Sequence, residues 1–147
     1  MCMDIRKQCV CGRESVRLHL RDNVMIPEVV LRIFCPNCPG DAAFDETSMI
    51  NDNGWVIEYD MDLARGLAAS KLQRAPDEVT PAFIFDQGYA CWLELYPGEQ
   101  AEIEAERAEI MKLLEVSQKH YLEAIQRWNI ERVARLKRAG WRRAQQT

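Results

Sequence analysis

Four cysteines in two closely spaced pairs constrain this chain more than any other feature of its sequence. Cys9 and Cys11 flank a single residue, and after 23 further residues Cys35 and Cys38 flank two. Each pair fits within one turn of backbone, so two turns are enough to bring four thiolates to one point. Four thiolates around one ion are typical of tetrahedral metal sites, in which zinc is the usual metal. The spacing therefore predicts a metal centre formed by these four cysteines.

The rest of the sequence favours reduced thiols over disulfides. Residues 1–12 contain no apolar segment like a signal-peptide core, and no apolar run approaches the roughly 20 residues that cross a bilayer. We therefore expect a cytoplasmic protein without membrane contact, in which cysteines are metal ligands or free thiols. Cys2 is then an exposed thiol, and Cys91, within an apolar run, is a buried hydrophobic residue. A secreted protein with disulfides is the alternative.

Three short segments around the cysteines are predicted to be strands. Residues 16–21 alternate apolar and polar side chains, which is the pattern of a half-buried strand. Residues 29–34 and 55–59 are rich in β-branched and aromatic residues, and they are predicted as the returning strand and a third strand. This arrangement puts both cysteine pairs at one end of a hairpin, with residues 39–54 as a loop.

The cysteine pairs and their flanking residues resemble the zinc-ribbon superfamily, including its rubredoxin-like members, over about residues 8–59. The matching residues are Cys9, Cys11, Gly12, Cys35, Pro36 and Cys38. The resemblance implies a small three-stranded ribbon and a structural Zn²⁺ with no open coordination position, and iron in a rubredoxin-like redox site is the alternative. The chain departs from the family in its C-x-C first pair. It also departs in Pro39, which stands where glycine is usual and has no N–H to donate to sulfur.

After the ribbon, the sequence predicts a short helix and a second hairpin. Asp60 or Asp62 is expected to cap a helix that runs to about Gln73, and its apolar stripe is expected to cover the sheet. Residues 83–85 and 89–96 are expected to pair as two strands on either side of a turn.

A long helix is predicted from Glu99 to about Ala139, because this segment contains no proline or glycine and is rich in helix formers. It would hold about 40 residues and extend roughly 60 Å. Apolar residues recur along it at intervals of 11, which produces a nearly straight stripe. The stripe consists of Ile103, Ile110, Leu114, Tyr121, Ile125, Trp128 and Leu136. A small ribbon cannot cover a stripe of this length, so the helix either folds back at a break or is covered by another chain.

Charge is distributed unevenly along the same segment. Residues 97–126 carry 7 acidic and 3 basic side chains, whereas residues 127–147 carry 1 acidic and 7 basic side chains. Two copies paired antiparallel would place the acidic half of one beside the basic half of the other, which favours an antiparallel homodimer of the coiled-coil kind. The helix macrodipole, which prefers acids at the start and bases at the end, explains the same distribution without a partner. Both explanations stay open.

Two groups of basic residues are candidates for nucleic-acid binding. One lies on the outer face of the predicted ribbon and the other at the C-terminal end. Together they comprise Arg17, His19, Arg21, Arg32, Arg135, Arg138, Arg142 and Arg143. Such side chains contact phosphates, and Trp141 offers a stacking surface. The net charge of −4 argues against binding by the whole surface, and an ordinary solvated surface is the alternative.

No set of residues points to catalysis. His19 and His120 are the only histidines, and neither stands with the nucleophile and acid of a catalytic set. The sequence predicts an α+β protein with a zinc-ribbon domain over residues 1–96 and a long helical arm over residues 97–147. We expect a non-catalytic protein whose metal is structural and whose helix binds a second copy or another protein. A nucleic-acid-binding or transcription-related module and an iron electron carrier are the alternatives.

Overall fold

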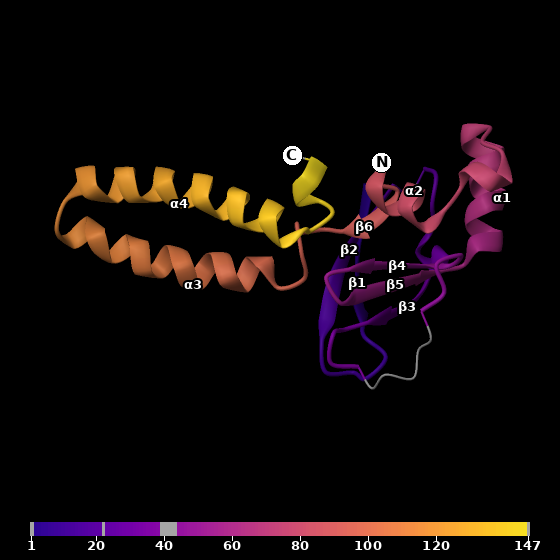
Figure 1. Cartoon of the computed structure of the whole chain (residues 1–147), viewed down its shortest axis with the longest axis horizontal. Coiled ribbons are helices and arrows are strands. Elements are labelled where there is room, and N and C mark those ends of the chain that lie inside the picture. Colours follow the sequence, from indigo (N-terminus) through magenta and orange to yellow (C-terminus); the bar gives the residue numbers. More distant parts are fainter. Residues whose placement is uncertain (1, 22, 39–43, 147) are drawn as a thin grey trace. The chain divides into compact units, whose positions relative to one another are not determined.

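The chain forms two compact units, which are described separately. The computed structural model describes residues 2–21, 23–38 and 44–146, and its units are Met1–Leu93 (unit 1) and Glu94–Thr147 (unit 2) (Figure 1). The predicted α+β class is confirmed, because unit 1 contains two small antiparallel sheets and unit 2 contains a long C-terminal helix. The predicted division after residue 96 lies close to the boundary between the units.

The first sheet of unit 1 has the strand order β1–β2–β6. Its strands are β1 (Cys2–Gln8), β2 (Ser15–Arg21) and β6 (Ala90–Trp92), and neighbouring strands are antiparallel. The alternation in β2 is confirmed, because Val16, Leu18 and Leu20 are buried and the residues between them face outward. The strand β1 was not predicted, since Met3 and Ile5 are its main apolar residues.

The second sheet has the order β3–β5–β4. Its strands are β3 (Val30–Phe34), β4 (Met49–Asp52) and β5 (Trp55–Tyr59). The turn between β4 and β5 is Asn53-Gly54, and both residues have positive φ, 52° and 95°. These values are typical of a type I′ turn, for which Asn-Gly is the strongest sequence signal. The strand β4 therefore occupies part of the segment that was predicted to be a loop, and the Asn-Gly pair was the sign of it.

The predicted hairpin between residues 16–21 and 29–34 is wrong. The strand β2 pairs with β1 and β6, whereas β3 pairs with β5 in the other sheet. The strand β1 reaches β2 through one short turn, and closing a short loop costs less entropy than closing a long one. The two three-stranded sheets thus use a different pairing from the predicted one.

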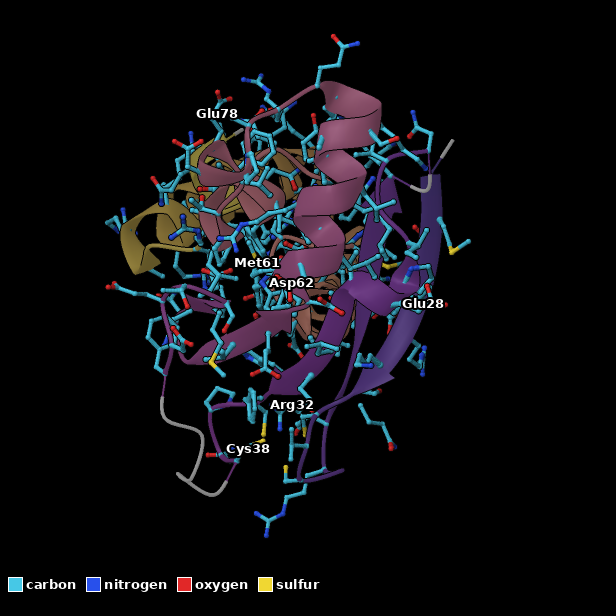
Figure 2. All side chains as sticks on the ribbon, turned by 90° about the vertical axis from the view of Figure 1, so that its right-hand side faces the viewer. Glu28, Arg32, Cys38, Met61, Asp62 and Glu78 are labelled. Atoms are coloured by element: carbon cyan, nitrogen blue, oxygen red, sulfur yellow. The ribbon has the colours of Figure 1, made fainter. Side chains whose placement is uncertain are left out.

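The predicted helix after the second sheet is confirmed as α1 (Met61–Leu72). Asp60 caps it, because its carboxylate accepts a hydrogen bond from the Leu63 N–H at 3.1 Å. Ala64 and Ala68 are fully buried in the core of unit 1, and Figure 2 shows Met61 and Asp62 where α1 begins. The helix therefore covers the core as the apolar stripe indicated.

The second predicted hairpin is replaced by a helix and a strand. Residues 81–86 form α2 (Pro81–Asp86), and only Ala90–Trp92 is a strand, which pairs with β2. The hydroxyl of Thr80 accepts a hydrogen bond from the Phe83 N–H, and Pro81 occupies the first helical position. A threonine cap followed by proline is a signal for the start of a helix. The apolar run after it is compatible with strand or helix, and this signal favours the helix. Two 3₁₀ turns, Pro27–Val29 and Pro76–Glu78, complete the connections.

Hydrogen bonds join the two sheets across the core of unit 1. The indole N–H of Trp92 donates to the buried carboxylate of Asp52 at 2.8 Å, and the Tyr59 hydroxyl donates to the Ala90 carbonyl at 2.6 Å. Each bond runs between one strand of the first sheet and one of the second. A buried carboxylate is costly without a partner, so the Trp92 N–H offsets part of that cost.

Unit 2 is a helical hairpin. Its elements are α3 (Glu99–Met111), the 3₁₀ turn Lys112–Glu115, α4 (Gln118–Ala139) and the 3₁₀ turn Ala144–Gln146. The predicted helix from Glu99 to Ala139 is therefore not continuous. The sequence allowed either a fold-back at a break or coverage by another chain, and the helix folds back. The break occurs at Ser117, whose hydroxyl caps α4 by accepting from the His120 N–H at 3.4 Å. The helix α4 ends at Ala139, as predicted, and Gly140 follows it in the left-handed region. We call α3 and α4 together the arm.

Within the described residues, no helix is both long enough and apolar enough to cross a membrane.

Candidate metal centre

The first cysteine pair lies in the turn between β1 and β2. The N–H of Cys9 bonds to the Glu14 carbonyl and continues the ladder of the two strands, while the Gly12 N–H bonds back to the Cys9 carbonyl. Gly12 has φ of 77°, which is a conformation that glycine adopts without strain. The Glu14 N–H points at the Cys9 sulfur, 3.4 Å away. This turn therefore presents both sulfurs and one backbone donor toward the same point.

The second pair follows β3 directly. The Cys38 N–H bonds to the Cys35 carbonyl at 3.0 Å, which closes a tight turn. The Cys35 N–H in return donates to the Cys38 sulfur at 3.2 Å. Pro36 within this turn packs against the turn of the second sheet, where a Cβ on Gly54 would lie 3.3 Å from its ring. Pro39, the predicted departure from the usual pattern, lies outside the described residues.

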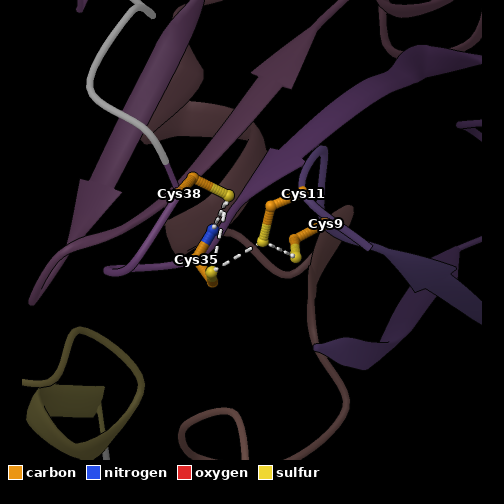
Figure 3. Close-up of side chains that lie close together, drawn as sticks. All are labelled: Cys9, Cys11, Cys35 and Cys38. Carbon is orange, nitrogen blue, oxygen red and sulfur yellow. Dashed lines mark hydrogen bonds between the residues drawn. The ribbon is translucent and has the colours of Figure 1, made fainter. Parts of the chain in front are cut away.

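The two turns converge, as Figure 3 shows, and Figure 2 places Cys38 at one end of unit 1. A backbone hydrogen bond of 2.8 Å from the Val10 N–H to the Ile33 carbonyl ties the first turn to β3. The hairpin that was predicted to align the pairs is absent, but this bond brings them together across the two sheets. All four sulfurs lie within 4.8 Å of one another. Cys9 and Cys35 are buried, and Cys11 and Cys38 are half-buried.

The sulfur spacing fits a single metal ion. The Sγ–Sγ distances are 3.1 Å for Cys9–Cys11, 3.6 Å for Cys11–Cys35 and 3.4 Å for Cys35–Cys38. A disulfide would require about 2.05 Å. Four thiolates at about 2.3 Å from a central zinc lie roughly 3.8 Å apart along each tetrahedral edge. The cluster is therefore a possible four-cysteine metal site of the predicted residues.

Two of the thiols have clearly separated pKa values. Burial raises the pKa of the Cys9 thiol, but hydrogen bonds from Cys11 and from the Glu14 N–H outweigh burial and bring this pKa to about 6. Burial together with hydrogen bonds to Cys38 and Cys11 raises the pKa of Cys35 to about 12. A thiolate at Cys9 and a thiol at Cys35 thus share the cluster at neutral pH.

The other two thiols follow the same division. The backbone at Arg13 lowers the pKa of Cys11, but the neighbouring Cys9 and burial raise it above its ordinary value. Burial raises the pKa of Cys38, but hydrogen bonds from the backbone at Cys11 and from the Cys35 thiol bring it below its ordinary value. Each turn therefore holds one cysteine whose pKa is lowered and one whose pKa is raised. A metal that binds all four must displace the remaining protons.

No family model matches the chain, and no curated protein or solved structure matches it. Its function is therefore inferred from its own residues and their geometry.

The basic residues predicted for nucleic acid on unit 1 lie on strands of two different sheets. Arg17, His19 and Arg21 share the outer face of β2, as predicted. His19 lies 3.6 Å from the Asp4 carboxylate, and the Arg21 guanidinium covers the ring of Tyr89.

Arg32 lies on β3 in the other sheet, where it pairs with Glu58 at 2.6 Å. This part of the predicted surface is thus divided between two sheets and is partly neutralised by acids.

The basic residues of unit 2 are also partly paired within the chain. The Arg135 guanidinium donates to Glu106 at 3.1 Å, and Arg143 donates to the Glu94 carbonyl at 3.0 Å. Arg138 is exposed on the last turn of α4, and Arg142, which follows the helix, is half-buried. The prediction of a nucleic-acid surface at this end stays a prediction.

The apolar residues predicted for self-association line the inside of the hairpin. All but Leu114 are half-buried or buried, and these are Ile103, Ile110, Tyr121, Ile125, Trp128 and Leu136. Leu114 is 45% exposed. The stripe is thus covered largely by the chain folding on itself, while its use in self-association is not tested by this arrangement.

Acidic side chains of α3 pair with basic side chains of α4 inside the hairpin. Arg132 pairs with Glu99 at 3.0 Å, and the side chains are 14% and 11% exposed. Glu106 accepts hydrogen bonds from the Trp128 indole N–H at 2.8 Å and from Arg135. The acidic first helix and the basic second helix are therefore complementary partners in one chain.

Several contacts of the arm were missed from the sequence. Glu99 and Glu106 bind side chains of the basic helix. Tyr96 stacks on Trp141 with ring centroids 5.0 Å apart, and its hydroxyl bonds to Glu102. The opposite net charges of the two halves of this segment were the signal for the fold-back.

Of the remaining candidates, Cys91 is buried in the core of unit 1, as predicted. The side chain of Cys2 lies outside the described part of the structure. His120 is exposed near the start of α4.

Proposed function

We propose that this chain is a non-catalytic zinc-ribbon protein whose metal site is structural and whose helical arm binds a protein partner or a second copy. The observation that carries the metal half is the convergence of four sulfurs from two separate turns. Thiolate sulfur is the usual ligand of structural zinc, and a site with four protein ligands has no position for substrate. Zinc held there by Cys9, Cys11, Cys35 and Cys38 would link the β1–β2 turn to the end of β3.

The backbone donors support this proposal. The Glu14 N–H points at the Cys9 sulfur, and the Cys35 N–H points at the Cys38 sulfur. Such N–H···S bonds disperse the negative charge of a site with four thiolates and orient its ligands. A reducing compartment such as the cytoplasm would keep these thiols available for metal.

Iron is the second candidate for the same four sulfurs, since four thiolates also hold a single iron in rubredoxin-like sites. The two metals predict different colours and different chemistry. Iron would make the chain an electron carrier, and zinc, which has no redox chemistry, would leave it a structural site.

Elemental analysis and an absorption spectrum of natively purified protein test the metal proposal. We expect one zinc per chain and no visible absorption. Iron with visible charge-transfer bands would replace the proposal with the electron carrier. If protein purified in a buffer without chelators contains neither zinc nor iron, both the structural site and the electron carrier are refuted.

The arm half of the proposal rests on exposed apolar side chains. Among the described residues, the arm and its connecting turn carry five large exposed hydrophobic residues: Met111, Leu114, Val116, Leu122 and Ile130. Val116 is 76% exposed and Ile130 is 73% exposed. Such side chains cost little singly, but several on one narrow hairpin are typical of a surface that binds protein.

Cross-linking through the arm tests this half. A photoreactive amino acid at Val116 should capture a protein, either a second copy or another chain, and the same probe at the polar position Gln126 serves as control. If neither position captures protein in cells, the arm does not bind a partner.

Nucleic-acid binding is tested by a salt titration. An affinity for duplex DNA that falls steeply with salt would establish the runner-up function instead. The internal pairing of Arg32 and Arg135 with acids weakens the expectation of such binding.

A further inference from the structure

The strand β1 is an edge strand with one side unpaired by the described chain. The first sheet has the order β1–β2–β6, so β1 has β2 on one side only. It is seven residues long, whereas the other edge, β6, has three. A long open edge is a surface for pairing with another strand.

The hydrogen-bond pattern shows which groups of β1 face that open edge. Leu93 donates to the Arg17 carbonyl and Arg21 donates to the Tyr89 carbonyl, so the odd-numbered residues of β2 bond toward β6. The even-numbered residues of β2 therefore bond toward β1, and in this register their partners are Met3, Ile5 and Lys7.

The even-numbered residues of β1 consequently direct their backbone groups away from β2. They are Cys2, Asp4, Arg6 and Gln8. Each presents one N–H and one C=O at the open edge, in the alternation that an antiparallel partner requires.

The side chains of β1 are complementary to a second copy of β1 in one register. A two-fold axis through Ile5 would place Asp4 opposite Arg6 of the second copy and Arg6 opposite Asp4, with Ile5 facing Ile5. Opposite charges in such cross-strand positions are stabilising, and like charges are destabilising. The alternative registers centred on Asp4 or on Arg6 would place acid against acid or base against base. The charges therefore allow one register and oppose its neighbours.

A second observation points to the same partner. Within the sheet, Arg6 lies directly opposite Arg17 of β2, which is a like-charge pair. Among the described residues no acid pairs with Arg6, whereas Asp4 has His19 at 3.6 Å. An acid across the open edge would give Arg6 an ion-pair partner.

We propose that β1 pairs antiparallel with β1 of a second copy, which joins the two first sheets into one six-stranded sheet. The pairing uses the edge N–H and C=O groups of Asp4 and Arg6 and their two reciprocal ion pairs. Ile5 meets its counterpart on the core side, and Met3, which is 37% exposed, lies beside it. Because a two-fold pairing of this kind uses up the same edge on both copies, it closes at a dimer. It depends on neither the metal nor the arm.

Charge reversal tests the register. The Asp4→Arg variant and the Arg6→Asp variant each place like charges opposite one another in a homodimer. Each should weaken dimerisation roughly 10- to 100-fold by sedimentation equilibrium of the metal-loaded full chain. An equimolar mixture of the two variants again puts acids opposite bases, so it should form a heterodimer. The double variant Asp4→Arg/Arg6→Asp is self-complementary and should dimerise like the original chain.

The outcomes separate this proposal from one in which the arm associates. Leu114→Asp on the arm should leave the β1 dimer intact. A chain that is monomeric up to about millimolar concentration overturns the proposal, as does a dimer that the single reversals do not weaken. A dimer lost only in Leu114→Asp assigns self-association to the arm instead. Circular dichroism and metal content confirm that each variant remains folded.

Discussion

Unit 1 and the arm are stabilised in contrasting ways. Among the described residues of unit 1, 22 are buried in one core to which both sheets and the helices contribute, and the four cysteines lie at one end of it. Among the described residues of unit 2, the corresponding core contains three: Tyr96, Leu136 and Ala144. In the arm, the half-buried apolar stripe is supplemented by polar contacts between an acidic and a basic helix.

This difference shows what each region needs from its sequence. Apolar burial contributes in proportion to area, so unit 1 tolerates charged residues on its outer faces. The arm has few fully buried residues, so the ion pairs between its two helices contribute a larger share of its contacts.

Replacing a cysteine of the cluster is expected to have the largest effect on the stability of unit 1. Cys35→Ser should abolish metal binding and destabilise unit 1 on the order of 5–10 kcal/mol, since the binding energy of a structural zinc is folding energy. The control is Cys91→Ala, which changes a buried cysteine outside the cluster and should keep one metal per chain. The measurement is metal content together with urea unfolding. Full metal content in Cys35→Ser would remove this residue from the site.

Metal affinity should also depend strongly on pH. The raised pKa values of Cys11 and Cys35 mean that both carry protons at pH 7, so metal binding must release them. Affinity should therefore fall as pH decreases, and more steeply below about 6, where Cys9 also gains its proton. Calorimetry in buffers of different ionisation enthalpy measures the protons released. Binding without proton release would contradict the assignment of all four thiols.

A smaller effect is expected at Glu106 in the arm. Hydrogen bonds from Trp128 and, after the opposing effect of burial, from Arg135 hold the pKa of Glu106 below its ordinary value. Its contribution to stability is thus complete above the ordinary pKa of 4.5 and is lost as pH falls through the lowered value. Glu106→Gln should destabilise the arm by about 1 kcal/mol at pH 7.

The matched control for this variant is Glu104→Gln. Glu104 is exposed and contacts only Gln100 of its own helix among the described side chains. Thermal unfolding by circular dichroism at pH 7 and at pH 3 measures both variants. Equal losses for the two variants at pH 7 would show that the acidic helix acts through its general charge and that Glu106 has no special role.

The smallest expected effect concerns the turn of the arm. Ser117→Ala removes the cap of α4 and should cost about 0.5 kcal/mol, since the bond to the His120 N–H is long. Ser117→Asp keeps a capping oxygen and should retain the stability of the original chain. Guanidinium unfolding of the two variants measures the difference. A larger loss in Ser117→Asp than in Ser117→Ala would argue against a capping role.

Local signals in the sequence predicted most of the elements correctly. The cap at Asp60, the helix end at Ala139 and the alternation in β2 each depend on neighbouring residues, and each was confirmed. The cysteine cluster was also predictable, because two short turns hold two sulfurs each regardless of how the sheets pair.

The pairing of strands was not predictable in the same way. Whether β2 meets β3 or β1 depends on contacts between residues far apart in the chain, and β1 carries few apolar residues to reveal it. The run around Phe83 was compatible with strand or helix until the cap at Thr80 decided it. The fold-back at Ser117 required reading the two charged halves as partners of each other.

A cobalt(II) titration of the reduced, metal-free chain tests the central claim most directly. Cobalt in place of zinc reports coordination by its absorption, because tetrahedral thiolate sites give intense visible bands with sulfur charge transfer, whereas octahedral oxygen sites absorb weakly. We predict saturation at one cobalt per chain with a four-thiolate spectrum, and a changed spectrum or lost binding when any one of the four cysteines is replaced by serine. No tetrahedral bands, or an unchanged spectrum in all four variants, would contradict a metal centre at this cluster.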